Sequence, residues 1–228
     1  MTETVSQYIN RVIDYAPRLM ESLSETGIMM AFAMVAAIAL GLPLGTLLFL
    51  TAKGKPMENK ILYQLANIVV DVVRSFPFLL LVIAMQPAIR YIYGRATGDP
   101  IAASFPMMVI AIVLYARFVE QSLLDVPKGV IETAQSMGAT IPQLVWHFLY
   151  VEARSSLLIG FTTAFVSFIS YSTIMGVIGG GGIGDFAIRY GYQRYETDIM
   201  YTAIIVIIVF VIFVQWLGLK AAHKLDKR

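Results

Sequence analysis

The chain has 228 residues, of which 58% are hydrophobic and only 14% are charged. Soluble globular domains carry about 25% charged residues, so this chain would expose too much apolar surface in water. The formal net charge of +2 is too small to indicate nucleic-acid binding. The absence of cysteine excludes disulfides, thiolate nucleophiles and cysteine metal ligands. The composition therefore indicates an integral membrane protein.

The first segment, residues 1–26, predicts an amphipathic helix. It lacks the basic start and the short apolar run of a cleavable signal peptide. Its apolar residues recur at helical spacing, among them Val5, Ile9, Val12 and Leu19. We expect this helix to lie on the membrane surface, although a helix that binds a partner would show the same pattern.

Five apolar segments follow, each close to the roughly 20 residues that a membrane-spanning helix needs. The third can extend toward Leu124 if Arg117 and Glu120 face protein. Continuous apolar runs also argue against a transmembrane β-barrel, in which polar and apolar residues alternate. We therefore predict an all-α membrane protein with one domain over residues 1–228 and five transmembrane helices, at residues 27–50, 61–89, 101–116, 155–184 and 199–219.

The distribution of lysine and arginine predicts the orientation, because basic residues favour cytoplasmic loops. With five spans, the two termini lie on opposite sides. The side with the C-terminus holds ten basic residues, and the other side holds six, which are offset by eight acidic residues. Every lysine lies on the first side. We therefore expect a cytoplasmic C-terminus and an outer N-terminus, which places residues 1–26 on the outer surface. The ten basic residues are Lys53, Lys55, Lys60, Arg117, Lys128, Arg154, Lys220, Lys224, Lys227 and Arg228.

The longest cytoplasmic segment, residues 125–152, is predicted to be ordered. Val130–Met137 can form a short helix, and Gly138 suits the end of that helix. Thr140 and Gln143 have the spacing of a capping box, which would start a second helix. The pattern fits either an ordered connector or a docking element for a cytosolic protein.

This segment resembles a motif of the ABC importer permeases. Glu132-Thr133-Ala134, three residues and then Gly138 is similar to E-A-A-x3-G, with threonine in place of the middle alanine. Arg74–Phe78 resembles the R-S-x-P-F element of the second span. Tyr171-Ser172, the glycines of 179–184 and Tyr190-Gly191-Tyr192 resemble the fourth span and outer loop of methionine-type permeases. The resemblance covers most of residues 28–220 in the same order.

The resemblance implies a type I ABC importer permease in a bacterial cytoplasmic membrane. In that family the loop at 125–152 is a coupling helix that docks on the ATPase, which assigns ATPase coupling to Glu132, Ala134, Met137, Gly138 and Ala139. It also implies an extracytoplasmic substrate-binding protein and methionine as the cargo, with another amino acid, a peptide or a small solute as the alternative.

The resemblance implies partners as well. The chain has no G-x-x-x-x-G-K-[ST] phosphate loop, so an importer of this type needs a separate ATPase, and we do not expect the chain itself to be an enzyme. Five spans are few for enclosing a path, and a homodimer with the pathway on its two-fold axis is the economical solution. We expect two copies of this chain with two cytosolic ATPase subunits, surrounded by lipid, and no cofactor or metal in the chain.

Charges inside the predicted spans are candidates for function, because they are costly in a membrane. Asp71 and Arg74 are three residues apart and share a helix face. They fit a local ion pair or a part of the gate. Arg117 and Glu120 repeat this spacing and are expected to support the coupling loop, although Glu132 could also pair with Arg117.

The fourth span contains hydroxyl groups beside large apolar residues. Such hydroxyls usually bond to the backbone of their own helix or to a neighbouring helix. The alternative is that this stretch lines the substrate path, where weak hydrogen bonds would release a small polar solute. The candidates for the pathway or gate are Phe168, Ser170, Ser172 and Met175.

Other functions leave specific signatures that this chain does not match well. Gly179, Gly181 and Gly184 fit G-x-G-x-x-G, but they follow an apolar membrane segment and not the strand of a dinucleotide-binding unit. An ion-coupled transporter would want inverted repeats and buried carboxylates, and Asp71 is the only acidic residue well inside a span. A membrane enzyme needs a nucleophile with a base or a metal cluster, and the two histidines, His147 and His223, are isolated. A purely structural subunit stays as a further alternative.

Overall fold

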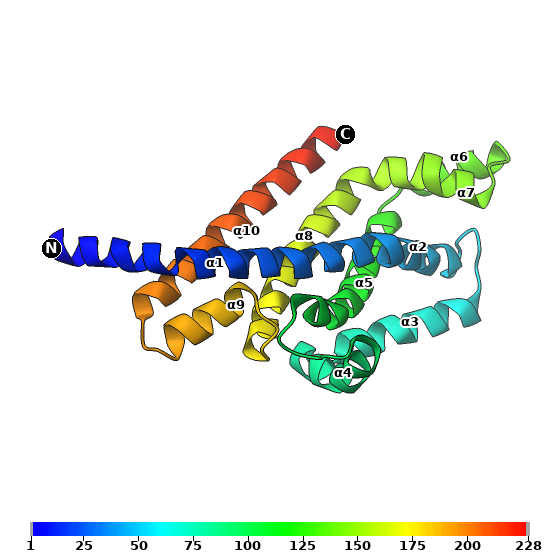
Figure 1. The fold of residues 1–228 in the computed structure, drawn as a ribbon. Coiled ribbons are helices and arrows are strands. Elements are labelled where there is room, and N and C mark those ends of the chain that lie inside the picture. Colours follow the sequence, from blue (N-terminus) through cyan, green and yellow to red (C-terminus); the bar gives the residue numbers. More distant parts are fainter. Residues whose placement is uncertain (1, 227–228) are drawn as a thin grey trace. The chain divides into compact units, whose positions relative to one another are not determined.

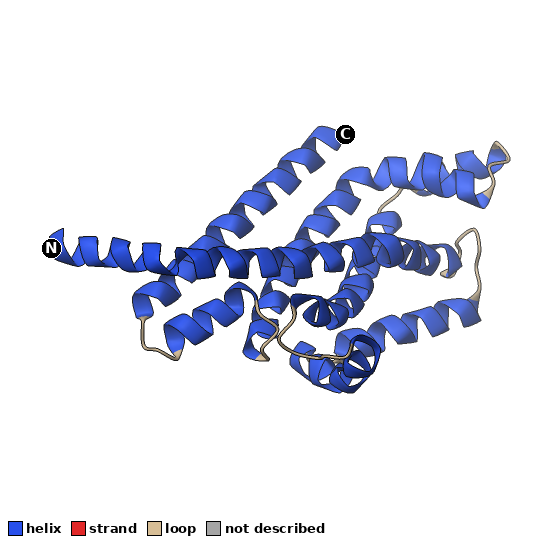
Figure 2. Cartoon of the chain, viewed as in Figure 1, coloured by secondary structure: helices blue, strands red, loops and turns tan. Residues whose placement is uncertain are grey.

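The computed structural model describes residues 2–226, with side chains from residue 7 onward. All regular elements in this range are helices (Figures 1 and 2). Lys227, Arg228 and the side chain of Val5, which entered the sequence predictions, lie outside the described parts. In chain order the helices are α1 (Thr2–Ala36), η1 (Ala37–Gly41), α2 (Leu42–Thr51), α3 (Lys60–Ser75), α4 (Phe78–Tyr93), α5 (Pro100–Leu124), α6 (Lys128–Ser136), α7 (Ile141–Gln143), η2 (Leu144–Leu149), α8 (Tyr150–Val177), α9 (Gly182–Phe186), η3 (Ala187–Tyr192) and α10 (Thr197–Leu225), where η marks a π-helical turn.

The chain divides into two compact units, each built from three stretches of sequence. Unit 1 contains the residues up to Ala33 together with Pro77–Met108 and Val166–Phe213. Unit 2 contains Met34–Phe76, Val109–Phe165 and the residues from Val214 onward. Unit 2 therefore holds the whole of the predicted coupling segment, and unit 1 holds most of the N-terminal helix and the glycine-rich segment.

The helices account for the predicted spans. Four are long and apolar enough to cross a membrane: Gln7–Thr51, Pro100–Leu124, Ile141–Val177 and Thr197–Leu225. A fifth span results if α3 and α4 are taken as one broken helix. This confirms the prediction of an all-α protein with several membrane helices. The break in the second span lies at Phe76, which is extended because the following Pro77 disfavours α-helical backbone at the residue before it.

The N-terminal helix is continuous with the first span. Residues 1–26 were expected as a separate amphipathic helix, but α1, η1 and α2 follow one another without a loop. Within unit 1, its apolar residues Val12, Tyr15, Leu19 and Leu23 pack against a buried cluster formed by Ile183, Phe186, Ile199 and Ala203. The apolar face of the helix thus contacts its own chain. Its position on the outer membrane surface stays a prediction.

The π-helical turn η1 leads into a close helix contact in unit 2. A Cβ atom on Gly41 would lie 2.7 Å from the carbonyl oxygen of Ile112, and one on Gly45 would lie still closer to the carbonyl oxygen of Ala116. Only glycine allows α2 to approach the backbone of α5 this closely. Pro43 follows the π-helical turn inside a helix that is continuous from Gln7 to Thr51, so its missing N–H removes one helical hydrogen bond.

Candidate functional site

The segment after α5 forms the predicted pair of helices joined by a glycine turn. α6 ends at Ser136, and Gly138 has a φ of 74°, which a residue with a side chain rarely adopts. The N–H of Ala139 donates to the carbonyl of Ala134 at 3.0 Å, and the N–H of Gly138 donates to the carbonyl of Gln135 at 2.9 Å. These two bonds form a Schellman motif, which ends a helix and reverses its direction.

The second helix begins as the spacing predicted. The backbone N–H of Thr140 donates to Oε1 of Gln143 at 2.8 Å, which is the reciprocal bond of a capping box. From Ile141 the chain continues through η2 into α8 without a loop, so residues 141–177 form one long helix. The short helix α6 is therefore joined by a defined turn to the start of a spanning helix.

The predicted docking residues fall on two faces of this segment. Glu132, Met137 and Gly138 are exposed, and Met137 has 64% of its surface accessible. Ala139 is partly buried. Ala134 is fully buried, so its side chain holds α6 against its own chain and cannot contact another protein in this state. Ile131, three residues earlier on the same face, is also buried.

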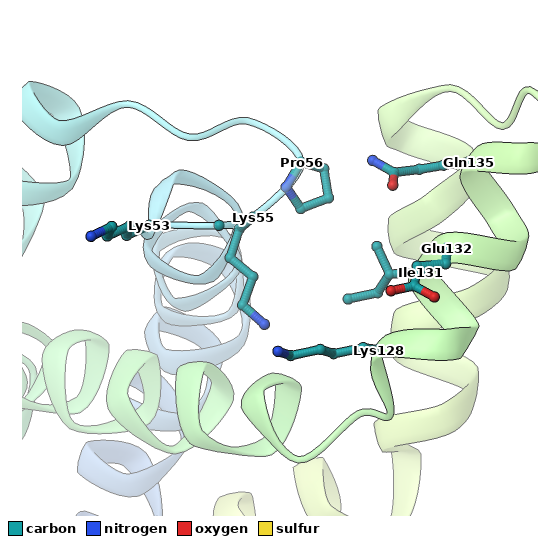
Figure 3. A pocket seen from close by; sticks show the side chains of 8 residues that line it. Lys53, Lys55, Pro56, Lys128, Ile131, Glu132 and Gln135 are labelled. Carbon is teal, nitrogen blue, oxygen red and sulfur yellow. The ribbon is translucent and has the colours of Figure 1, made fainter.

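A pocket of about 560 Å³ lies beside α6, between that helix and the turn that follows α2 (Figure 3). Lys53 and Lys55 line it from the turn, and Lys128, Glu132 and Gln135 line it from α6. The ammonium of Lys55 lies 4.2 Å from the centroid of the Phe49 ring. Burial, and secondarily the charge of Lys128, lowers the pKa of Lys55 below its ordinary value. Sequence reasoning assigned these lysines to the cytoplasmic side but did not bring them together.

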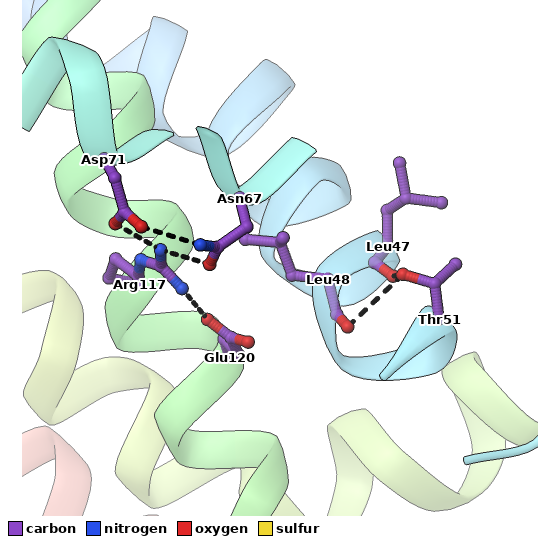
Figure 4. Close-up of polar contacts among 7 residues, drawn as sticks. All are labelled: Leu47, Leu48, Thr51, Asn67, Asp71, Arg117 and Glu120. Carbon is purple, nitrogen blue, oxygen red and sulfur yellow. Dashed lines mark hydrogen bonds and ion pairs between the residues drawn. The ribbon is translucent and has the colours of Figure 1, made fainter. Parts of the chain in front are cut away.

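The charges of the second and third spans form a network in unit 2 (Figure 4). Arg117 donates to Asp71, to Oε2 of Glu120 at 2.6 Å and to Oδ1 of Asn67 at 2.6 Å. Asn67 in turn donates to Asp71 at 2.6 Å. The expected pair of Arg117 with Glu120 is thus present.

The expected local pair of Asp71 with Arg74 is wrong. Asp71 bonds Arg117 across to α5, and Arg74 is exposed with no partner within the described range. Within this chain neither Asp71 nor Arg74 is buried, since the side chain of Asp71 has 52% of its surface accessible. Glu132 does not reach Arg117, whose carboxylate partners are Asp71 and Glu120. Asp71 thus pairs with the arginine that also bonds Asn67 and Glu120, so that these four side chains share one network.

The four candidates for the substrate path do not share one face of α8. Phe168, Ser172 and Met175 are buried inside unit 1, with accessible fractions of 0%, 1% and 2%. The hydroxyl of Ser172 donates to the carbonyl of Ile169 in its own helix, as the plain interpretation of membrane hydroxyls expects. Ser170 is exposed. The three buried residues are therefore packing residues in this state, and Ser170 is the one whose side chain is free to meet a solute.

The glycine-rich segment is held by two residues of α1 that sequence reasoning missed. A carboxylate oxygen of Glu25 accepts a hydrogen bond from the N–H of Gly182 at 2.7 Å, and Oγ1 of Thr26 accepts one from the N–H of Ile183 at 2.9 Å. These are the first N–H groups of the helix formed by α9 and η3, so Glu25 and Thr26 act as its N-terminal caps. The segment follows the helix α8, which also contradicts a dinucleotide-binding loop.

Comparisons with known proteins agree with this architecture. Two proteins described as probable D-methionine transport system permease proteins MetI are similar to this chain over most of their length. That of Vibrio cholerae is 40% identical over 92% of this chain and 93% of its own, and that of Pasteurella multocida is 39% identical over 93% and 99%. The methionine import system permease protein MetP of Bacillus subtilis is 37% identical over 80% of this chain and 82% of its own.

Solved structures show the same fold. A chain of the MetNI methionine ABC transporter, in a structure of its inward-facing conformations, matches with a TM-score of 0.89 at 32% identity and covers 92% of this chain and 96% of that chain. A chain of an amino acid ABC transporter matches with a TM-score of 0.77 at 17% identity over 94% and 97%. The fold is therefore that of the type I ABC importer permeases.

The family match covers most of the chain and includes every element described above from α2 onward. Residues 41–225 fit the family described as binding-protein-dependent transport system inner membrane component. With its several apolar helices, the chain is a multi-pass membrane protein. It belongs to the family of inner membrane components of binding-protein-dependent transport systems, whose members are non-catalytic permease subunits.

Proposed function

We propose that this chain is the permease subunit of an ATP-driven methionine importer in a bacterial cytoplasmic membrane. The inference that transport is driven by ATP rests on the exposed surface of the α6–α7 segment, where Glu132 and Met137 lie at a defined glycine turn. Methionine as cargo is supported by the names of three similar permeases and of the transporter with the matching fold.

The contacts of unit 2 explain how a motion of the docked segment would reach the spans. The hydroxyls of Tyr150 and Thr46 share a hydrogen bond of 2.7 Å that joins α8 to α2. Nε of Arg154 donates to the carbonyl of Leu225 at 2.8 Å, which joins α8 to the end of α10. Because α6 packs through Ile131 and Ala134, a displacement of the docked surface carries the cytoplasmic ends of several helices with it.

The proposed transport cycle uses this linkage. Two copies of the chain form a homodimer around a central path, and each α6–α7 segment docks on one of two ATPase subunits. ATP binding draws the ATPase subunits together and opens the path outward, where a substrate-binding protein delivers the solute. Hydrolysis returns the dimer to the inward-open state. The exposed face of α8 that carries Ser170 lines the path.

The test is methionine uptake into vesicles that contain the full complex with its ATPase. We expect Glu132→Ala to lower ATP-dependent uptake about tenfold or more, because Glu132 is exposed on the proposed docking surface. Gly138→Ala should also weaken coupling, since a Cβ at φ 74° costs about 1–2 kcal/mol and tilts the turn. Thermal stability of the purified chain should stay close to wild type for Glu132→Ala.

Two matched controls accompany these variants. Glu21→Ala removes an exposed carboxylate from α1, and Gly94→Ala puts a Cβ at a similar positive φ of 84° at the end of α4, where no atom lies within 4 Å. Both should leave uptake unchanged. The proposal fails if the chain neither binds an ATPase nor moves methionine. Uptake that follows an ion gradient without ATP would instead assign the chain to ion-coupled transport.

A further inference from the structure

The pocket beside α6 carries positive charge that the described residues do not neutralise. Three lysines, Lys53, Lys55 and Lys128, line it together with a single carboxylate, that of Glu132. Within residues 7–226 none of these four side chains forms an ion pair. Figure 3 shows the ammonium groups of Lys55 and Lys128 pointing toward each other, that of Lys53 pointing away from them, and Glu132 farther along α6. Like charges held this close repel unless an anion joins them.

The lysines of the turn are presented by an ordered backbone. The N–H of Gly54 donates to the carboxylate of Glu58 at 2.8 Å, and the N–H of Met57 donates to the carbonyl of Leu50 at 3.0 Å. The ring of Phe49 lies against the ammonium of Lys55. Because these contacts fix the turn before any ligand arrives, little conformational entropy is lost when an anion binds.

The pocket also lies at the level where the apolar spans end. Lys53 follows the last residue of the first span, Thr51, by two positions, and Lys128 follows the last residue of α5, Leu124, by four. The phosphate groups of a bilayer occupy this level, and basic pockets at the ends of membrane helices bind anionic lipid head groups.

The turn that carries Lys53 and Lys55 leads directly into α3, which presents an apolar face. The exposed side chains Ile61, Leu65 and Ile68 follow the first turns of α3 at helical spacing, with 71%, 59% and 56% of their surface accessible. We propose that this pocket binds the phosphate head group of an anionic phospholipid through Lys55 and Lys128. An acidic surface of the ATPase would meet the same lysines, but it would not need the apolar face of α3.

Native mass spectrometry of the full chain, purified in a neutral detergent, tests this proposal. The probes are phosphatidylglycerol and phosphatidylcholine with identical acyl chains. We expect wild type to retain phosphatidylglycerol preferentially, with each lysine contributing about fivefold to the ratio. The double variant Lys55→Gln, Lys128→Gln should lose most of that preference. The double variant Lys220→Gln, Lys224→Gln removes the same charge outside the pocket and should keep it.

One variant should act in the opposite direction. Glu132→Gln removes the only carboxylate of the pocket and should raise the retention of phosphatidylglycerol, which a misfolded variant could not do. Equal retention of both lipids by wild type would overturn the proposal, as would an unchanged ratio in the Lys55, Lys128 variant. Millimolar inorganic phosphate that protects the chain while neither lipid is preferred would assign the pocket to a free anion.

The ATPase provides the remaining test. If the Lys55, Lys128 variant loses binding to the ATPase while the lipid ratio stays at the wild-type value, the pocket belongs to the protein partner and the proposal is wrong. Lipid retention needs neither ATP nor methionine, so its outcome is independent of the transport experiment.

Discussion

Arg117 is the residue on which the charges of unit 2 converge. Its side chain has 15% of its surface accessible, and it bonds the carboxylate of Glu120, of which only 8% is accessible. It also joins α5 to Asp71 and Asn67 on α3. The guanidinium of Arg117 thus neutralises the carboxylates of both Asp71 and Glu120. Removing that cation would leave Glu120 as a buried charge without its partner, which is more costly than losing an exposed ion pair.

We therefore predict that Arg117→Gln lowers the free energy of unfolding by about 1–3 kcal/mol. The measurement is the thermal midpoint of the purified chain in detergent. Arg18→Gln is the matched control, because Arg18 and Glu21 form a pair with the same three-residue spacing that is exposed at 62% and 59%. An exposed pair contributes about 0–1 kcal/mol.

A second variant separates the charge effect from lost packing. Combining Arg117→Gln with Glu120→Gln removes the buried charge as well and should recover part of the loss. Equal destabilisation by Arg117→Gln and Arg18→Gln would show that the network contributes no more than a surface pair.

At the scale of elements, the helix formed by α9 and η3 depends on a distant helix for its start. Gly181 and Gly182 have positive φ values, so the chain enters this helix without a conventional N-terminal cap. The missing acceptors come from Glu25 and Thr26, 157 residues earlier in sequence. The pairing of α1 with the glycine-rich segment is thus fixed by hydrogen bonds as well as by apolar packing.

Thr26→Val tests this arrangement, because valine keeps the shape of threonine and removes the acceptor. We expect a local loss of about 1 kcal/mol, seen as about fivefold faster hydrogen exchange of the amides in residues 182–192. Ser24→Ala is the control, since the hydroxyl of Ser24 is exposed and bonds the carbonyl of Glu21 in its own helix. Unchanged exchange in Thr26→Val would mean that these amides find another acceptor.

The helices and turns were easier to predict from the sequence than the contacts between helices. Spans and the α6–α7 turn follow from local signals, namely apolar runs, the glycine at residue 138 and the Thr140–Gln143 spacing. The pairs Asp71–Arg117 and Glu25–Gly182 join residues 46 and 157 positions apart, and no local period reports which helices pack together. Sequence reasoning chose Arg74 for Asp71 because the two share a face.

The candidate site was predictable to the same degree. The exposed Glu132, Met137 and Gly138 lie where the family motif implies, whereas the motif could not tell that Ala134 is buried. Whether Phe168, Ser170, Ser172 or Met175 lines the path stays a prediction, but the structure places Ser170 on a different face from the other three. Hydroxyl and apolar residues were grouped by proximity in sequence, but successive residues of α8 point in different directions.

At the scale of the whole molecule, the orientation in the membrane determines which surfaces meet which partners. All lysines lie on the side predicted to be cytoplasmic, together with the α6–α7 segment and the basic pocket. The opposite side has the exposed tyrosines Tyr91 and Tyr195, at 91% and 92% accessible surface. The proposed function needs the first side to face the ATPase.

The lack of cysteine makes this orientation directly measurable. We predict that Met137→Cys reacts with a membrane-impermeant maleimide only in inside-out vesicles, and that Tyr195→Cys reacts only in right-side-out cells or spheroplasts. Both positions are exposed in the chain itself, so vesicles that contain the chain without its ATPase report sidedness and not burial. The unmodified chain supplies a background without any reactive thiol. The reverse pattern would invert the topology and remove the α6–α7 segment from contact with a cytosolic ATPase.

The π-helical turn at Ala37–Gly41 determines which deletions the first span can tolerate. Such a turn accommodates one residue more than the α-helical repeat. Because the wider turn absorbs that residue, deleting one residue there would restore regular α-helix and leave Gly41 and Gly45 facing the carbonyls of α5. Deleting one residue from the regular α-helix before the turn would instead rotate everything beyond it by about 100°. The turn is therefore the place where the first span tolerates the loss of a residue without losing its contact with α5.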